Sequence, residues 1–104
     1  MYLSMEKIIL EVCEKIVELV SPRQIFLFSQ KSTLDGGISA FKICVVSEGN
    51  PAEIEGKIYL AIECSVSFDV LVYSAEDWDR LSPINSSFAS HILKCGSVVY
   101  VQTT

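Results

Sequence analysis

The chain has 104 residues, which suffice for a single domain over residues 1–104 and leave no room for a second one. Half of the residues are hydrophobic and 20% are charged, whereas an average domain carries about 25% charged residues. This composition excludes a disordered chain, because enough apolar surface is present for burial. The net charge of −5 argues against general binding to nucleic acid or to an anionic membrane surface.

The apolar composition also bears on partners and location. A small domain buries a low fraction of its surface. A small domain rich in apolar residues therefore retains exposed apolar surface, which favours binding to a protein partner or formation of a homo-oligomer. No stretch of about 18 apolar residues is present, which predicts no membrane span. The first residues lack the pattern of a signal peptide, and we therefore expect a cytoplasmic protein.

The cysteines show no metal-binding pattern. All four lie in apolar segments and none is spaced as a zinc ligand: Cys13, Cys44, Cys64 and Cys95. They are predicted to be buried free thiols of a reducing compartment. Neither a metal site nor a cofactor is expected from them.

In the first half of the chain, the pattern of apolar residues predicts one helix and two strands. Helical periodicity extends from Ser4 to Val20, with Ser4 as N-cap. Gln24 to Phe28 is an apolar run typical of a strand buried on both faces. Ser29 to Ser39 is polar and contains a Gly-Gly turn, which predicts a loop. Ala40 to Val46 predicts a second strand, antiparallel to the first.

The middle of the chain predicts a crossover between parallel strands. Asn50 followed by a proline is typical of a helix start, and this helix is expected from Pro51 to about Cys64. Phe68 to Tyr73 is the third predicted strand. A strand, a helix and a strand in this order favour a right-handed crossover between parallel neighbours.

Three shorter elements complete the prediction. They are a helix from Ala75 to Leu81 capped by Ser74, a helix that begins at Ser86 or Ser87 and ends at Gly96, and a strand from Val98 to Val101. Gly96 is expected to be the left-handed residue after the last helix. Together the elements predict an α/β (α+β) fold, a mixed β-sheet flanked by helices.

The residues at the strand ends resemble those of a known family. The first strand ends in Phe28-Ser29-Gln30, and the second begins Ser39-Ala40-Phe41-Lys42-Ile43. The third strand carries Asp69 and leads into the acidic segment Ser74-Ala75-Glu76-Asp77-Trp78. With the last helix, its glycine and the closing strand, this layout resembles the minimal nucleotidyltransferase-like domains of the polymerase β type over nearly the whole chain.

The family's functional residues are only partly matched. Where the family has a Gly-Ser that binds the triphosphate, this chain has Ser29-Gln30, and where it has two metal-binding aspartates the chain has Ala40 and Lys42. Only Asp69 matches the third aspartate. Two-metal phosphoryl transfer needs clustered carboxylates, so the resemblance implies a degenerate site without catalytic or metal-ligating residues. What remains is a weak nucleotide-binding remnant, made of Ser29, Gln30, Lys31 and Lys42.

Lys42 permits two interpretations. If the family's strand register holds, its ammonium lies where the metal would be and forms a structural ion pair with Asp69. Alternatively, Lys42 extends to solvent at a strand end. Asp35 in the loop is a weak substitute ligand, and His91 is expected to be a surface histidine, because no nucleophile is placed beside it.

Three functions follow as hypotheses. The first is a pseudoenzyme, a catalytically degenerate nucleotidyltransferase-like domain that serves as a binding or regulatory subunit. The resemblance implies a separate helical partner protein for it, as in toxin–antitoxin pairs. The second is an active or nucleotide-binding nucleotidyltransferase with a displaced metal site. The third is an unrelated α/β domain that forms a structural homo-oligomer.

Overall fold

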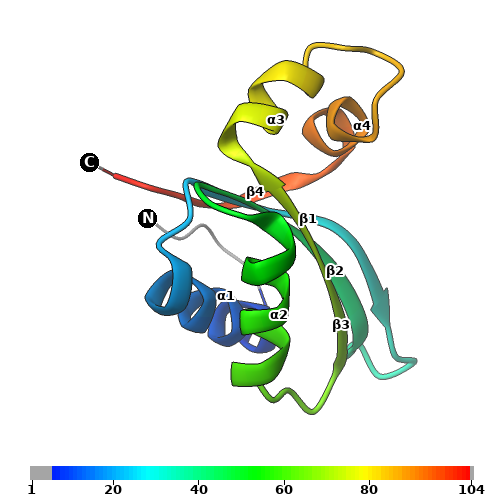
Figure 1. Cartoon of the computed structure of the whole chain (residues 1–104). Helices are drawn as coiled ribbons and strands as arrows, with labels where there is room; N and C mark the ends of the chain where they lie inside the picture. The colour runs from blue at the N-terminus through cyan, green and yellow to red at the C-terminus, as the bar shows by residue number, and fades with distance from the viewer. Residues whose placement is uncertain (1–5, 104) are drawn as a thin grey trace.

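A mixed four-stranded sheet is the centre of the computed structural model, which describes residues 6–103 (Figure 1). Its strands are β1 (Gln24–Ser32), β2 (Ile38–Ser47), β3 (Ser67–Ser74) and β4 (Ser97–Val101), in the spatial order β3-β2-β1-β4. The helices are α1 (Lys7–Val20), α2 (Pro51–Ala61), α3 (Ala75–Leu81) and α4 (Phe88–Cys95). β1 is antiparallel to β2 and β4, and β2 is parallel to β3. The predicted fold class is confirmed, and so are the antiparallel pairing of β1 with β2 and the parallel pairing of β2 with β3.

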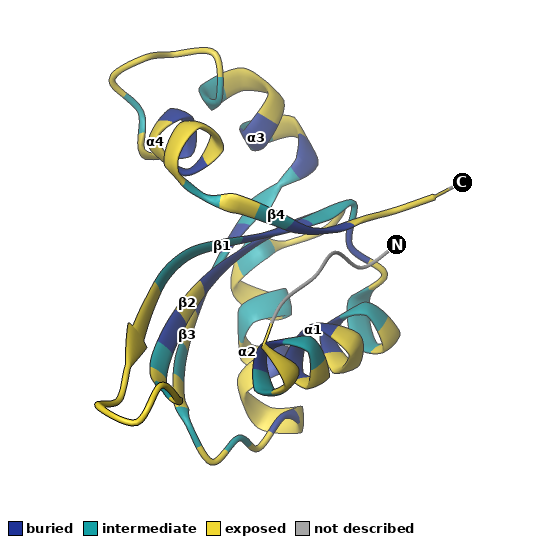
Figure 2. Cartoon of the chain, turned by 180° about the vertical axis from the view of Figure 1, so that it is seen from behind, coloured by how far each residue is buried: buried dark blue, intermediate teal, exposed yellow. Residues whose placement is uncertain are grey.

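Two helices pack on each face of the sheet. On one face α1 and α2 pack against β-strand residues that include Ile25, Ile43 and Val45. On the other face α3 and α4 cover a smaller cluster around Phe26, Cys44, Val46, Trp78 and Ile92. β2 contributes alternate residues to both clusters, which is why its second half is a continuous apolar run. Figure 2 shows this buried centre and the exposed hairpin between β1 and β2.

Side-chain caps start three of the helices. The side chain of Asn50 accepts a hydrogen bond from the backbone N–H of Glu53 at 3.1 Å. Ser74 and Ser87 accept in the same way from residues three positions on, each at 3.0 Å. These contacts confirm the predicted caps and select Ser87 over Ser86 for α4. The predicted cap Ser4 lies outside the described residues.

Two predicted boundaries are wrong. The loop expected over Ser29–Ser39 is mostly strand, because β1 continues to Ser32 and β2 begins at Ile38. Polar side chains suit this part of the hairpin, since one face of it is open to solvent while the backbone groups pair across the strands. The helix expected to reach Cys64 ends at Ala61, where Ile62 adopts an extended conformation and turns into the core.

Gly96 does follow the last helix, but the prediction that it is a left-handed residue is wrong. Its φ of −84° is not left-handed, so no conformational need for glycine exists there. A Cβ at this position would instead lie 2.7 Å from the carbonyl oxygen of Ile92 and 3.2 Å from that of Leu27. Gly96 is thus required because it lies close both to a carbonyl group in the last turn of α4 and to the backbone of β1.

Gly96→Ala is therefore expected to destabilise the chain by about 1–3 kcal/mol, because backbone atoms must move to admit the methyl group. Gly56→Ala is the matched control. Gly56 lies inside α2, where a Cβ would meet nothing within 4 Å, and alanine there should stabilise by about 0.5–1 kcal/mol. Urea unfolding of both variants at low protein concentration measures the difference. Equal effects of the two substitutions would contradict the packing reason.

An ion pair joins the start of β1 to α3. The guanidinium of Arg23 donates two hydrogen bonds to the carboxylate of Asp79, at 2.7 and 3.0 Å. These bonds from Arg23 lower the pKa of Asp79 below its ordinary value of 3.8. A lowered pKa in the folded chain stabilises it above the pKa of the unfolded carboxyl, and that contribution disappears as the pH falls through the folded value.

Asp79→Asn is expected to lower stability at pH 7 by a small amount, since both partners are exposed. The difference from the unsubstituted chain should begin to shrink as the pH falls below the ordinary value of 3.8, and it should vanish once the pH is below the lowered pKa of the folded chain, because the Asp79 carboxyl is then protonated in both states. Urea unfolding of both chains, measured from neutral to acidic pH, gives the difference in their free energies of unfolding at each pH. A difference that persists unchanged at acidic pH would show that the contact does not depend on the charge of Asp79.

Candidate functional site

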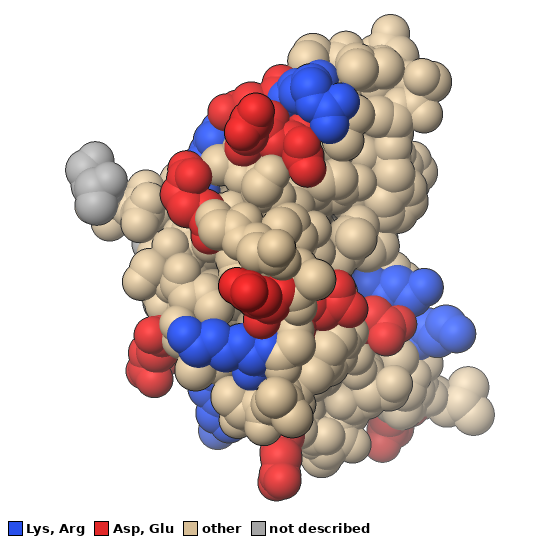
Figure 3. All heavy atoms as spheres, in the orientation of Figure 1, with Lys and Arg blue, Asp and Glu red and all other residues tan. Residues whose placement is uncertain are grey.

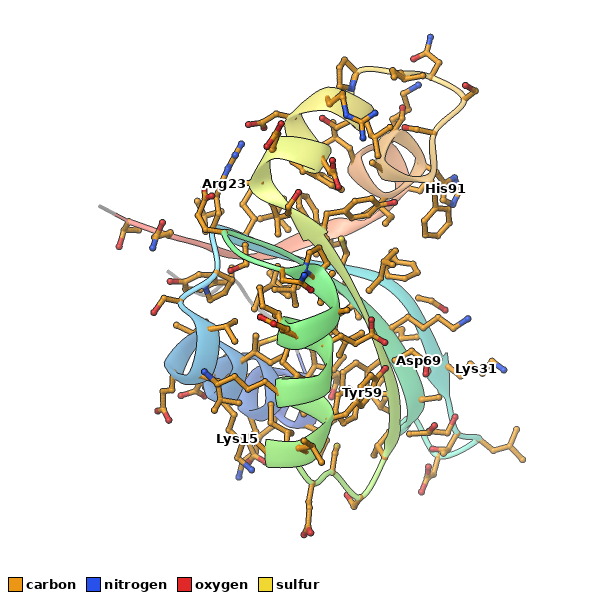
Figure 4. All side chains as sticks on the ribbon, in the orientation of Figure 1. Lys15, Arg23, Lys31, Tyr59, Asp69 and His91 are labelled. Carbon is orange, nitrogen blue, oxygen red and sulfur yellow. The ribbon has the colours of Figure 1, made fainter. Side chains whose placement is uncertain are left out.

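The helices α3 and α4 leave part of their face of the sheet uncovered. A cavity of about 280 Å³ lies on the open part, lined by Ser29, Lys31, Ala40, Phe41, Lys42, Ser67 and Asp69. Figure 4 shows Lys31 and Asp69 on the side of the strands away from α1 and α2. The volume is just below the lower end of the range typical of small-molecule sites, about 300 Å³. We call this cavity the sheet pocket.

Strand register brings the pocket residues together. Lys42 of β2 lies between Ser29 of β1 and Asp69 of β3, and Ala40 lies between Lys31 and Ser67. Cross-strand neighbours project from the same face of a sheet, so these two rows form the floor and sides of the pocket.

A β-bulge in β1 allows Ser29 to join this group. Leu27 is opposite Ile43, but Ser29 is opposite Lys42, so one extra residue, Phe28, stands in β1 at this point. Phe28 packs with the cluster below α3 and α4, and its ring meets that of Phe88 edge to face at 5.6 Å. The bulge thus places an aromatic contact directly beside the polar pocket. This contact was not predicted from the sequence, where its only signal is a phenylalanine at the start of the last helix.

Three of the four predicted remnant residues meet in the pocket. Ser29, Lys31 and Lys42 line it, together with Asp69. Gln30 is opposite Phe41, is exposed and is not among the lining residues. Whether the group binds a nucleotide stays a prediction.

Lys42 and Asp69 are direct cross-strand neighbours, but both are exposed. The salt bridges among residues 6–103 are Arg23–Asp79 and Arg80–Asp77, and neither involves the pocket. An exposed lysine needs no partner to offset desolvation, so the position of Lys42 fits its second interpretation, extension to solvent. The Lys42–Asp69 ion pair stays a prediction.

The charged side chains that line the pocket carry more positive than negative charge. Two ammonium groups and the hydroxyls of Ser29 and Ser67 accompany one carboxylate, that of Asp69. Within residues 6–103, no group of three His, Cys, Asp or Glu side chains is arranged to hold a metal ion. Magnesium takes oxygen ligands and is repelled by ammonium groups, so the residues present do not fit the metals of a two-metal transferase.

Other candidates lie away from the pocket. Asp35 is in the hairpin turn, where a hydrogen bond from the Thr33 hydroxyl lowers the pKa of its carboxyl. His91 is exposed, as predicted, and its ring stacks on Phe88 at 5.7 Å. Neither residue lines the sheet pocket.

All four cysteines are free, but they are not all buried as predicted. Burial raises the pKa of the Cys13 and Cys44 thiols to about 12, which leaves them unreactive at neutral pH. Cys64 is partly buried, and Cys95 is exposed. Cys95 is the last residue of α4, past the contacts that Ala89 and Ile92 make with the core.

Comparisons of the chain with models of protein families, with curated proteins and with solved structures find no match. In the part of the chain that the structure describes, no helix has the length and apolar character needed to cross a bilayer.

The double variant A40D/K42D tests the account of the pocket. It places two further carboxylates beside Asp69 on the same face of the sheet, and it removes the central ammonium group. We expect it to bind Mn²⁺ with a dissociation constant of about 10⁻³ M or tighter. Calorimetry should detect no Mn²⁺ binding to the unsubstituted chain under the same conditions.

The variant A40N/K42N is the control, because it removes the lysine without adding carboxylates. Equal Mn²⁺ binding by A40D/K42D and A40N/K42N would contradict the placement of positions 40, 42 and 69 around one point.

Proposed function

We propose that this protein is a catalytically inactive nucleotidyltransferase-like domain that serves as a binding or regulatory subunit of a protein complex. The observation that carries the proposal is the make-up of the sheet pocket. At the two positions where the resemblance places metal-binding aspartates, the pocket has Ala40 and Lys42. Only Asp69 stands in for the family's acids, so the pocket lacks the means to hold the metal ions that phosphoryl transfer requires.

The surface supports a binding role. Several large hydrophobic side chains of the described residues are 40% exposed or more: Leu34, Tyr59, Leu60, Ile84, Phe88, Leu93 and Val101. They are spread over the hairpin, α2, the loop between α3 and α4, α4 itself and the end of β4 rather than gathered in the pocket. A small domain buries a low fraction of its surface, so a chain that is half hydrophobic retains apolar side chains for contacts with other proteins. The resemblance implies that the partner is a helical protein.

The pocket supports a second candidate function, a site for a phosphate-bearing nucleotide that binds without a divalent cation. Lys31, Lys42 and the Ser29 hydroxyl are the donors that a phosphate group requires, and they lie on adjacent strands. In this case the bound nucleotide regulates the subunit, because no metal activates it for transfer. The aromatic rings of Phe28 and Phe88 stand at the border of the same region.

Calorimetric titration with ATP, with and without Mg²⁺, separates these functions. The proposal predicts that Mg²⁺ does not strengthen binding. Binding that is unaffected by Mg²⁺ and is weakened at least about tenfold in K31A/K42A would favour the regulatory nucleotide site, since two charge-assisted contacts are lost. Absence of binding would favour a subunit that acts through protein contacts alone.

Binding of ATP that Mg²⁺ strengthens would contradict the proposal and would favour an active transferase with a displaced metal site. Lys94→Ala is the control for a general loss of positive charge, since Lys94 contacts Asn85 near α4 and does not line the pocket.

A further inference from the structure

The outward face of α2 has no contact within the chain that explains its sequence. Ala52, Gly56 and Leu60 follow one another at four-residue steps and therefore form one stripe along the helix. All three are exposed, and the Leu60 side chain is 90% exposed. The core side of α2 is formed instead by Ile58, with Ile54 partly buried. In Figure 3, α2 faces the viewer, and an uncharged surface there is bordered by acidic and basic side chains.

Gly56 lies at the middle of this face. Glycine inside a helix costs about 1 kcal/mol relative to alanine, so it needs a reason. Neither a positive φ nor a neighbouring atom supplies one, because a Cβ there would meet nothing within 4 Å. A second helix that crosses at this point supplies the reason, since the absence of a side chain lets the two backbones approach closely.

The charges beside the stripe are complementary to those of a second copy. Glu53 and Lys57 lie on the same side of the stripe, one turn apart. The Lys57 ammonium donates to the carbonyl oxygen of Leu19 at 3.2 Å, which holds it on the side of α2 that faces α1. An ammonium group has three donors, so it can also bind a carboxylate of another chain.

We propose that two copies of this chain form a dimer through α2. The helices lie antiparallel, face to face, with the two-fold axis at Gly56. This arrangement places Ala52 against the partner's Leu60 and Glu53 beside the partner's Lys57, and the symmetry repeats both contacts. The two-fold axis brings the same flank of α2 from both chains to one side of the interface. Glu53 of each chain therefore lies beside Lys57 of the other, which gives two opposite-charge pairs.

A second copy fits this face because the face is complementary to itself in shape and in charge. Small residues at one end of the stripe receive the large Leu60 of the other chain, and Glu53 meets the partner's Lys57. The face lies on the side of the sheet covered by α1 and α2, opposite the sheet pocket. The dimer therefore leaves the pocket open, and the inference does not depend on the proposed function.

Sedimentation equilibrium over a range of protein concentrations tests the dimer. Two short helices bury less area than a standard interface, so we expect a reversible dimer whose fraction rises with concentration. Glu53→Lys and Lys57→Glu should each raise the dimer dissociation constant at least about tenfold, because two attractive pairs become repulsive. The double variant E53K/K57E should restore it to within about threefold of the original value, since the pairs are re-formed in reverse.

Glu76→Lys is the matched control, because it makes the same charge change on α3, on the other face of the sheet. It should leave the dimer unchanged. Leu60→Glu should abolish the dimer, and the circular dichroism of every variant should match that of the unsubstituted chain.

A chain that stays monomeric at all concentrations would overturn the inference. So would a dimer that Leu60→Glu leaves intact, or one that the double charge exchange fails to restore while each single variant remains folded.

Discussion

The burial of β2 on both faces is the constraint on which the other features depend. Ile43 and Val45 lie under α1 and α2, while Cys44 and Val46 lie under α3 and α4. A shift of one residue in this strand would exchange the two sets, so the register is strongly determined. That register places Lys42 on the face of α3 and α4 and opposite Asp69 of β3.

The sheet pocket follows from the unequal cover of the two faces. α1 and α2 together provide twenty-five helical residues over one face, whereas α3 and α4 are short helices of 7 and 8 residues. The short pair covers only the end of the strands near Phe26 and Val46. Beyond it, the strands carry polar side chains that are satisfied by solvent. This uneven cover leaves an open site on the sheet, and the residue at its centre is Lys42 rather than an acid.

Local signals in the sequence predicted much of the fold. Asn50 before Pro51 and Ser74 before two acids are strong helix starts, because the cap and the first-turn charges act within four residues. The burial of β2 on both faces was also predictable, because its apolar residues form a continuous run and do not alternate with polar ones. The length of the β1–β2 hairpin was not, because its residues are as polar as those of a loop and the strand pairing decides their conformation.

The pocket was predictable only through strand pairing. The resemblance brought Ser29, Lys42 and Asp69 together, since it supplied a register that composition and periodicity do not contain. The bulge at Phe28 escaped prediction because a bulge adds one residue without changing the residue types. Gly96 showed the opposite problem: glycine after a helix suggests a left-handed residue, whereas the close approach of Ile92 and Leu27 decides its role.

The absence of a metal site from the pocket is the central claim, and paramagnetic broadening by Mn²⁺ tests it most directly. Amide spectra of the unsubstituted chain would be recorded as Mn²⁺ is added in small amounts. The account predicts no selective loss of the signals of Ser29, Lys42 and Asp69 relative to exposed acidic positions such as Glu11 and Glu14 on α1. Selective loss of those three signals would contradict it, because a metal ion would then be held where Lys42 stands.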